Sequence, residues 1–237
     1  VGSEMCIRDR YKAAAESGSI DGLIGLADCY KEGRGTEKDS EAAKALLLRA
    51  GSAGSGEAFK ELGDLIHEES HSSEDEKQAH EAYQKAVKLG ATEAYASLVI
   101  ECFTKDFRRK QKDPVPLALK YTAEAMKAET DPTTLLMISH LFTVVQDPRL
   151  LKPAADLAEK AAESGEAAAL FILATYYAHG VGRDPDPRKA AQHLKAFGEA
   201  GDARQKFEAA QILLNGDDGY RKDTRAACQL FEASARM

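Results

Sequence analysis

Residues 22–54 read GLIGLADCYKEGRGTEKDSEAAKALLLRAGSAG, and this stretch decides the fold of the chain. Apolar residues recur in it every three or four positions, first around Leu23 and Leu26 and again around Ala43 and Leu47. Such spacing places apolar side chains on one face of a helix. Glycines follow each run, and glycine commonly ends helices. The stretch therefore predicts two helices joined by a turn.

The same hairpin recurs with a period of about 36 residues, which is typical of helical repeat proteins. One row of equivalent positions, near the end of each second helix, is mostly alanine: Ala14, Ala50, Ala86, Ala125, Ala161, Phe197 and Ala233. A second row marks each first helix: Leu26, Leu62, Leu98, Met137 and Leu173. The predicted division is a half repeat to residue 18, then units 19–54, 55–90, 91–129, 130–165, 166–201 and 202–237.

Glycine and proline support these boundaries. Five glycines follow the second helices and are expected to take the left-handed conformation that ends a helix: Gly18, Gly54, Gly90, Gly165 and Gly201. All seven prolines are expected in connections or first helical turns, where the missing N–H does no harm. Asp39 and Asp186 precede second helices and are expected to cap them.

A hairpin of this size cannot bury its own apolar face, so successive hairpins must stack on one another. Composition agrees, because 41 alanines against 15 valines and isoleucines favour helices over strands. We therefore expect an all-α solenoid of about six hairpins spanning residues 11–237. Residues 1–10 (VGSEMCIRDR) match nothing later in the chain, and we interpret them as a non-native extension.

Charge and cysteine content exclude several functional classes. The 237 residues carry 32 Lys and Arg against 39 Asp and Glu, a net charge of −7 that disfavours general nucleic-acid binding. No apolar stretch approaches the roughly 20 residues that a membrane-spanning helix needs. The four cysteines lie far apart without CxxC spacing, so neither a zinc site nor a disulfide framework is indicated.

Residues 22–54 and 169–201 resemble the Sel-one-like repeat, a relative of the tetratricopeptide repeat. In the first stretch the resemblance is carried by Leu26, Ala27, Tyr30, Gly33, Gly35, Asp39, Ala43, Ala50 and Gly54. In the second it is carried by Leu173, Ala174, Tyr177, Gly180, Gly182, Asp186, Ala190 and Gly201. The resemblance implies a right-handed solenoid that serves as a non-catalytic interaction scaffold for a protein or peptide. It implies no cofactor.

By the same resemblance, the first helices line a concave groove that binds the partner. In units one and two this face is expected to be acidic, with Asp21, Asp28, Glu32, Glu57, Asp64 and Glu68. In later units it is expected to be apolar, with Ile100, Phe103, Leu135, Phe142, Phe171, Phe207 and Leu214. A peptide with hydrophobic anchors and basic flanks is the expected ligand. The alternative is that these apolar residues pack in the hairpin cores.

Three other sequence features have competing interpretations. His67 and His71 match HExxH, a zinc-protease motif that requires one continuous helix; we expect the helix to end too early and predict no metal site. The basic run of residues 105–112 is interpreted as a solvated loop, with an acidic partner as the alternative. The segments Gly33–Gly35 and Gly180–Gly182 are interpreted as turns, not phosphate loops.

Two further possibilities stay open at this level. The chain begins in mid-repeat, so it could be a structural or oligomerisation segment of a longer repeat protein. With the native N-terminus in question, the sequence assigns no cellular compartment. A zinc hydrolase centred on His67 and His71 is the alternative from the enzyme class.

Overall fold

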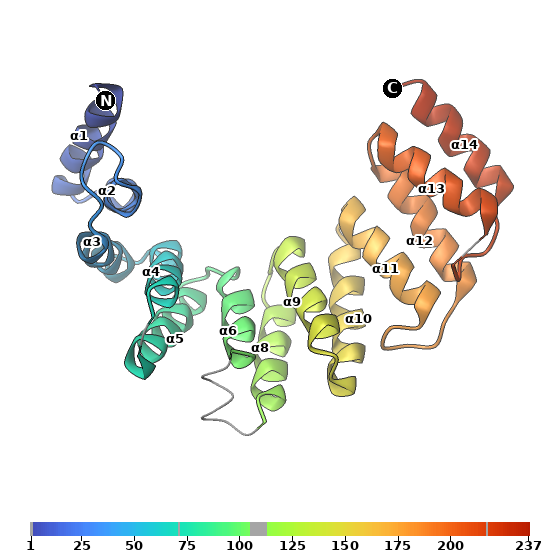
Figure 1. Ribbon diagram of the computed structural model, residues 1–237, viewed down its shortest axis with the longest axis horizontal. Helices are drawn as coiled ribbons and strands as arrows, with labels where there is room; N and C mark the ends of the chain where they lie inside the picture. The colour runs from blue at the N-terminus through green and yellow to red at the C-terminus, as the bar shows by residue number, and fades with distance from the viewer. Residues whose placement is uncertain (1, 71, 105–112, 217) are drawn as a thin grey trace. The chain divides into compact units, whose positions relative to one another are not determined.

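The computed structural model describes residues 2–70, 72–104, 113–216 and 218–237, and every regular element in these ranges is an α-helix. The basic run of residues 105–112 and His71 lie outside the described residues. The chain divides into two compact units, residues 1–101 and 102–237, each with its own succession of helices (Figure 1). None of the helices within the described ranges is both long and apolar enough to cross a bilayer.

The first unit contains antiparallel helix pairs that follow the repeat period. Helix α1 spans Gly2–Glu16. The next two pairs are α2 (Ile20–Glu32) with α3 (Ser40–Ser52), and α4 (Gly56–Glu68) with α5 (Ser73–Lys88). Helix α6 runs from Ala94 to Cys102 at the edge of this unit. Residues 2–10, interpreted above as an extension, are part of α1, which packs on α2.

The second unit continues the alternation of first and second helices. It contains α8 (Val115–Lys127), followed by α9 (Pro132–Val145) and α10 (Pro148–Ala162). Two more pairs complete it, α11 (Ala167–His179) with α12 (Pro187–Ala200), and α13 (Ala203–Asn215) with α14 (Thr224–Ala235). We call α2, α4, α6, α9, α11 and α13 first helices, and α3, α5, α8, α10, α12 and α14 second helices.

Small residues at repeated positions let the helices approach closely. Ala50, Ala86, Ala125 and Ala161 are completely buried, and Phe197 is nearly so. Gly51 allows a still closer approach, because a Cβ atom there would lie 2.8 Å from the ring of Phe59 on the next helix. Burial of these rows between successive pairs supplies the hydrophobic stabilisation that a single hairpin lacks.

The loop glycines and capping aspartates behave largely as predicted. Gly33 and Gly180 adopt φ values of 72° and 71° and end α2 and α11. The Asp39 carboxylate accepts a hydrogen bond from the amide of Ala42, and Asp186 accepts from those of Arg188 and Lys189. Both segments are therefore turns that begin a second helix, as their sequences predict.

Two expectations about glycine and proline are wrong. Gly201 follows α12 with φ −81° and ψ 176°, an extended conformation, whereas Gly18, Gly54, Gly90 and Gly165 do have positive φ. Pro153 lies inside α10, not in a connection or first turn. The ring removes one hydrogen-bond donor from that helix, which nevertheless continues to Ala162.

Candidate functional site

The first helices carry a row of exposed or half-buried positions spaced three or four residues apart, which we call the outer stripe. On α2 it contains Asp21, Gly25, Asp28 and Glu32, and on α4 it contains Glu57, Glu61, Asp64 and Glu68. On α9 it contains Thr133, Met137, His140 and Val144. Residues at this spacing lie above one another on one face of a helix. The outer stripe is therefore the solvent-facing surface of these first helices.

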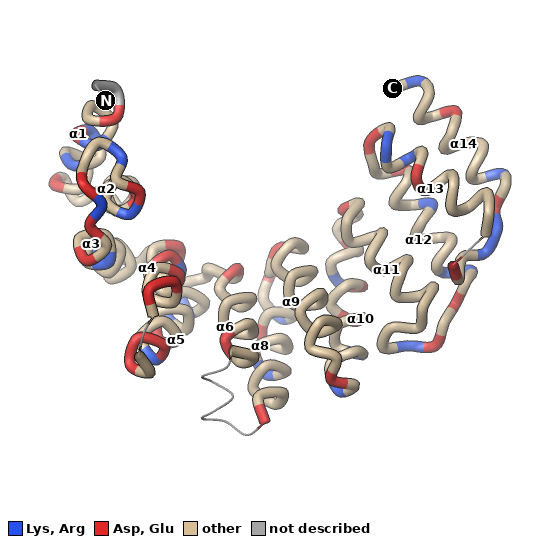
Figure 2. Tube along the Cα trace, in the orientation of Figure 1, with Lys and Arg blue, Asp and Glu red and all other residues tan. Residues whose placement is uncertain are grey.

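In the first unit the outer stripe is acidic, and part of its charge is already paired. The Tyr83 hydroxyl donates a hydrogen bond to Asp64 Oδ1 at 2.9 Å, and Lys60 Nζ lies 2.8 Å from Asp64 Oδ2. Asp28 lies 3.8 Å from the Arg34 guanidinium. Figure 2 shows acidic positions along α4 and α5. Asp28 and Asp64 are thus held by neighbouring groups, while Glu32 and Glu68 are exposed.

Glu61 joins this acidic surface and was not singled out from the sequence. It is half-buried, and burial raises its pKa, with the nearby charges of Asp28 and Glu57 raising it further. A like-charge neighbourhood of this kind disfavours the ionised carboxylate. Its spacing, four residues after Glu57 and three before Asp64, is the signal that could have revealed it.

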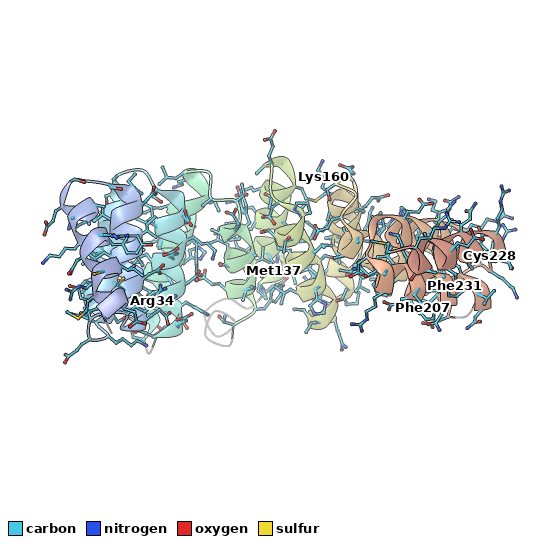
Figure 3. All side chains as sticks on the ribbon, turned by 90° about the horizontal axis from the view of Figure 1, so that it is seen from above. Arg34, Met137, Lys160, Phe207, Cys228 and Phe231 are labelled. Carbon is cyan, nitrogen blue, oxygen red and sulfur yellow. The ribbon has the colours of Figure 1, made fainter. Side chains whose placement is uncertain are left out.

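The apolar residues predicted to line the groove are exposed, half-buried or buried. Ile100, Phe207 and Leu214 expose 40%, 49% and 37% of their surfaces. Phe103 and Phe171 are half-buried because each ring packs against another: Phe103 against Phe142 and Phe171 against Phe197. Phe207 lies beside Phe231 with the ring centroids 5.3 Å apart (Figure 3).

Leu135 and Phe142 are buried, so the prediction that they line an exposed surface is wrong. Leu135 exposes 3% of its surface and Phe142 none. Met137, which the repeat spacing aligns with the buried Leu26, instead exposes 52% of its surface, while Ile138 beside it is buried. All three differences have one origin, a shift of one residue in the register of α9 relative to the other first helices.

The shift follows from the connection between α9 and α10. The repeat positions predicted for this unit follow from Ala161 on the second helix, counted back at the common spacing. In units one and five a loop from Gly33 or Gly180 to the capping aspartate separates the two helices. Here only Gln146, with φ 58°, and the capping Asp147 do so. A shorter connection changes the rotation of α9 relative to α10.

On α9 the outer stripe presents apolar side chains to solvent. Met137 exposes 52% and Val144 61% of their surfaces, and Thr133 and His140 are exposed between and beside them. Among the described residues of the second unit, the large exposed apolar side chains lie on first helices, except for Met237 at the chain terminus. In the described ranges, the second helices of that unit carry no large exposed apolar side chain. Exposed apolar surface in the second unit is therefore concentrated on α9 and α13.

The HExxH segment does not form the continuous helix that its zinc-binding reading requires. Helix α4 ends at Glu68, and Glu69 is its C-cap. His71, the second histidine of the motif, lies outside the described residues. Elsewhere in the described chain, no group of three His, Cys, Asp or Glu side chains is arranged to hold a metal ion.

Comparison with protein families agrees with the repeat pattern. The Sel1 repeat matches residues 20–55, 141–166, 167–202 and 207–237, which together make up more than half of the chain. The chain belongs to the Sel1 repeat family. Its fold is accordingly the all-α repeat solenoid predicted from the period, and the resemblance stated from residues 22–54 and 169–201 is confirmed. No curated protein sequence matches this Sel1 repeat chain.

Two solved structures share its fold at low sequence identity. A protective antigen of uropathogenic Escherichia coli with an SLR fold is 22% identical with a TM-score of 0.60, and the match covers 98% of the present chain. The present chain spans about half of that antigen, 49% of its length. A Sel1 repeat protein from Oxalobacter formigenes is 20% identical with a TM-score of 0.54, covering 97% of this chain and 99% of that one.

Proposed function

We propose that this Sel1 repeat chain is a non-catalytic scaffold that binds a protein or peptide partner through the outer stripe of its first helices. The observation that carries the proposal is the exposure of Met137 and Val144 on α9. These side chains are seven residues apart, about 10 Å along the helix axis, and lie on one face of it.

Exposed apolar side chains of this size are more informative as a group than singly. Single ones are common on protein surfaces, but here they share the stripe position of one helix, and the adjacent core positions Ile138 and Phe142 are fully packed. Met is flexible and polarisable, which suits adaptable contact with a partner. An amphipathic helix or an extended segment with apolar anchors is the kind of partner that such a face accommodates.

In the first unit the outer stripe would contribute charge instead of apolar area. Glu32 and Glu68 are exposed, and Glu61 is held in a like-charge neighbourhood with Asp28 and Glu57. A basic segment would lower this repulsion and would be steered toward the acidic face. These features define the chemistry of the partner, which combines apolar anchors with a basic segment.

Selection from a phage-displayed random peptide library tests the proposal. Peptides selected on the whole chain should carry apolar anchors. The Met137→Asp variant should no longer bind these peptides. Lys160→Asp on second helix α10 is the matched control, because Lys160 is exposed and belongs to the same unit. Retention of every selected peptide by Met137→Asp and Val144→Asp would contradict the proposal.

The alternative of a structural or oligomerisation segment is favoured by one observation at the α13–α14 pair. Phe207 and Leu214 are exposed there, and Leu214, Tyr220 and Phe231 line a depression of about 430 Å³. Sedimentation at increasing protein concentration separates the two functions. Self-association that Phe207→Asp abolishes would support the oligomerisation reading.

A further inference from the structure

A groove lies on the face of α4 opposite the outer stripe, between the second helices α3 and α5. Its volume is about 860 Å³, within the range of roughly 300–1,000 Å³ that small-molecule pockets occupy. The floor is apolar and is made by Ala45, Leu48, Phe59, Leu62, Ile66 and Ala82. Leu48 exposes 48% of its surface there. We call this the α3–α5 groove.

The rim of the α3–α5 groove carries more acidic than basic groups. Its two cations are already engaged: Lys44 Nζ lies 2.9 Å from both Glu41 and Glu69, and Lys85 Nζ lies 5.4 Å from the centre of the Phe59 ring. Glu81 of α5 is exposed on this rim, and no cation of the described residues forms an ion pair with it. Four acidic side chains against two lysines give the lining of the groove a negative net charge.

The equivalent groove between the last two repeats has different side chains. At a spacing of 147 residues, Leu48 corresponds to Lys195 and Phe59 to Lys206. Lys195 and Lys206 both line a hollow of only about 260 Å³ between α12, α13 and α14. Lys206 Nζ donates to the carbonyl oxygens of Gly198 and Glu199 at 3.2 Å and also to that of Gly201.

The fold does not require an apolar side chain at every position that lines the α3–α5 groove. Helices α12 and α13 pack with lysines at these positions, so the fold does not require an apolar side chain at the position of Leu48, whereas Phe59 exposes only 7% of its surface and belongs to the core. Leu48 in particular gains little from folding, because about half of its surface stays in contact with water. Leu48 adjoins the apolar floor of the groove and forms a continuous apolar patch with it, and such patches mark contact surfaces.

We propose that the α3–α5 groove binds a peptide segment of a protein partner, with one bulky apolar side chain on the floor and a Lys or Arg beside Glu81. The proposal is independent of the outer stripe, which lies on the other face of α4. Covering Leu48 removes apolar surface from water and supplies the attraction. The cation beside Glu81 then fixes the direction of the segment.

The test uses fluorescein-labelled peptides and the full chain, with fluorescence anisotropy as the measurement. One peptide has a central Phe between two pairs of lysines, a second has glutamates in place of the lysines, and a third has Ser in place of Phe. Saturable binding of the first with a dissociation constant below about 1 mM, and weaker binding of the other two, is expected. Absence of saturable binding by the first peptide would overturn the proposal.

Two pairs of variants place the binding in the groove. Leu48→Lys copies Lys195 of unit 166–201 and should weaken binding about tenfold or more. Leu89→Lys is its control, because Leu89 is equally exposed in the same unit but lies outside the groove. Glu81→Lys should weaken binding of the lysine peptide, whereas Glu37→Lys, an exposed change in the loop between α2 and α3 and outside both the groove and the outer stripe, should not.

Thermal melts of the four variants verify that each is folded. Equal binding by Leu48→Lys and wild type, or equal weakening by Leu48→Lys and Leu89→Lys, would overturn the proposal. Loss of binding in Met137→Asp with full binding in Leu48→Lys would also overturn it, since the peptide would then occupy the outer stripe.

Discussion

The backbone amide of Asp186 donates a hydrogen bond to the carbonyl oxygen of Tyr177 at 2.8 Å, while its carboxylate caps helix α12. Asp39 does the same in the first unit, donating to the Tyr30 carbonyl oxygen at 2.9 Å and capping α3. One aspartate thus closes the loop on the first helix and begins the second. This double role fixes the geometry of the α2–α3 and α11–α12 hairpins.

Replacing this aspartate should destabilise the repeat in a predictable way. Asp186→Ala removes the cap to two amides and should lower the free energy of unfolding by about 1 kcal/mol. Asp184→Ala, two residues earlier and exposed, should change it by less than about 0.5 kcal/mol. Urea unfolding measures both. Equal effects would mean that the cap contributes nothing.

Gly54 tests the positive backbone angle that ends α3. Its φ is 107°, and a Cβ atom there would meet no other atom within 4 Å, so the backbone angle alone decides the outcome. Gly54→Val should therefore cost about 1–2 kcal/mol of stability, measured by thermal unfolding. The neighbouring Ala53 has φ −82°, and Ala53→Val should be tolerated. An unchanged melting temperature for Gly54→Val would contradict the account of this turn.

The register of α9 predicts opposite outcomes for two phenylalanines of the second unit. Phe142 exposes none of its surface and Phe207 exposes 49%. Phe142→Ala should lower the free energy of unfolding by about 3–5 kcal/mol. Phe207→Ala should lower it by roughly 1 kcal/mol or less, the scale of its ring contact with Phe231. Similar losses in denaturant unfolding would show that α9 has a different register.

Glu61 predicts a pH-dependent gain in stability. Burial and the charges of Asp28 and Glu57 raise its pKa in the folded state, so the ionised carboxylate lowers stability above that pKa. Glu61→Gln should raise the melting temperature at neutral pH, and the gain should shrink as the pH falls and Glu61 becomes protonated in both states. Glu68→Gln, an exposed change on the same helix, is the control. A gain that is independent of pH would exclude the electrostatic cause.

The sequence predicted those features that depend on local chemistry. The two glycines and the aspartate of residues 33–39 locate a turn and a cap by themselves, and the spacing of Leu26, Leu62 and Leu173 locates core positions that are all buried. These features require only a helix period and residues that end helices. The same turns, caps and core positions are present in the observed helix pairs.

The candidate site was harder to predict because it depends on helix rotation. The repeat spacing aligns Met137 with the buried Leu26 and predicts Phe142 on the surface, whereas Met137 is exposed and Phe142 buried, since no glycine loop marks the connection at Gln146 and Asp147. The α3–α5 groove was missed for a different reason. Its floor joins Leu48, Phe59 and Ala82 from three helices, and no local pattern reveals that Leu48 is left uncovered.

The central claim is that a partner binds the outer stripe of α9. A photo-crosslinking amino acid placed at position 137, and separately at position 160 on α10, tests it directly with a peptide selected on the whole chain. The account predicts a crosslink from position 137 and none from position 160. Crosslinking of equal yield at both positions, or at position 160 alone, would contradict it.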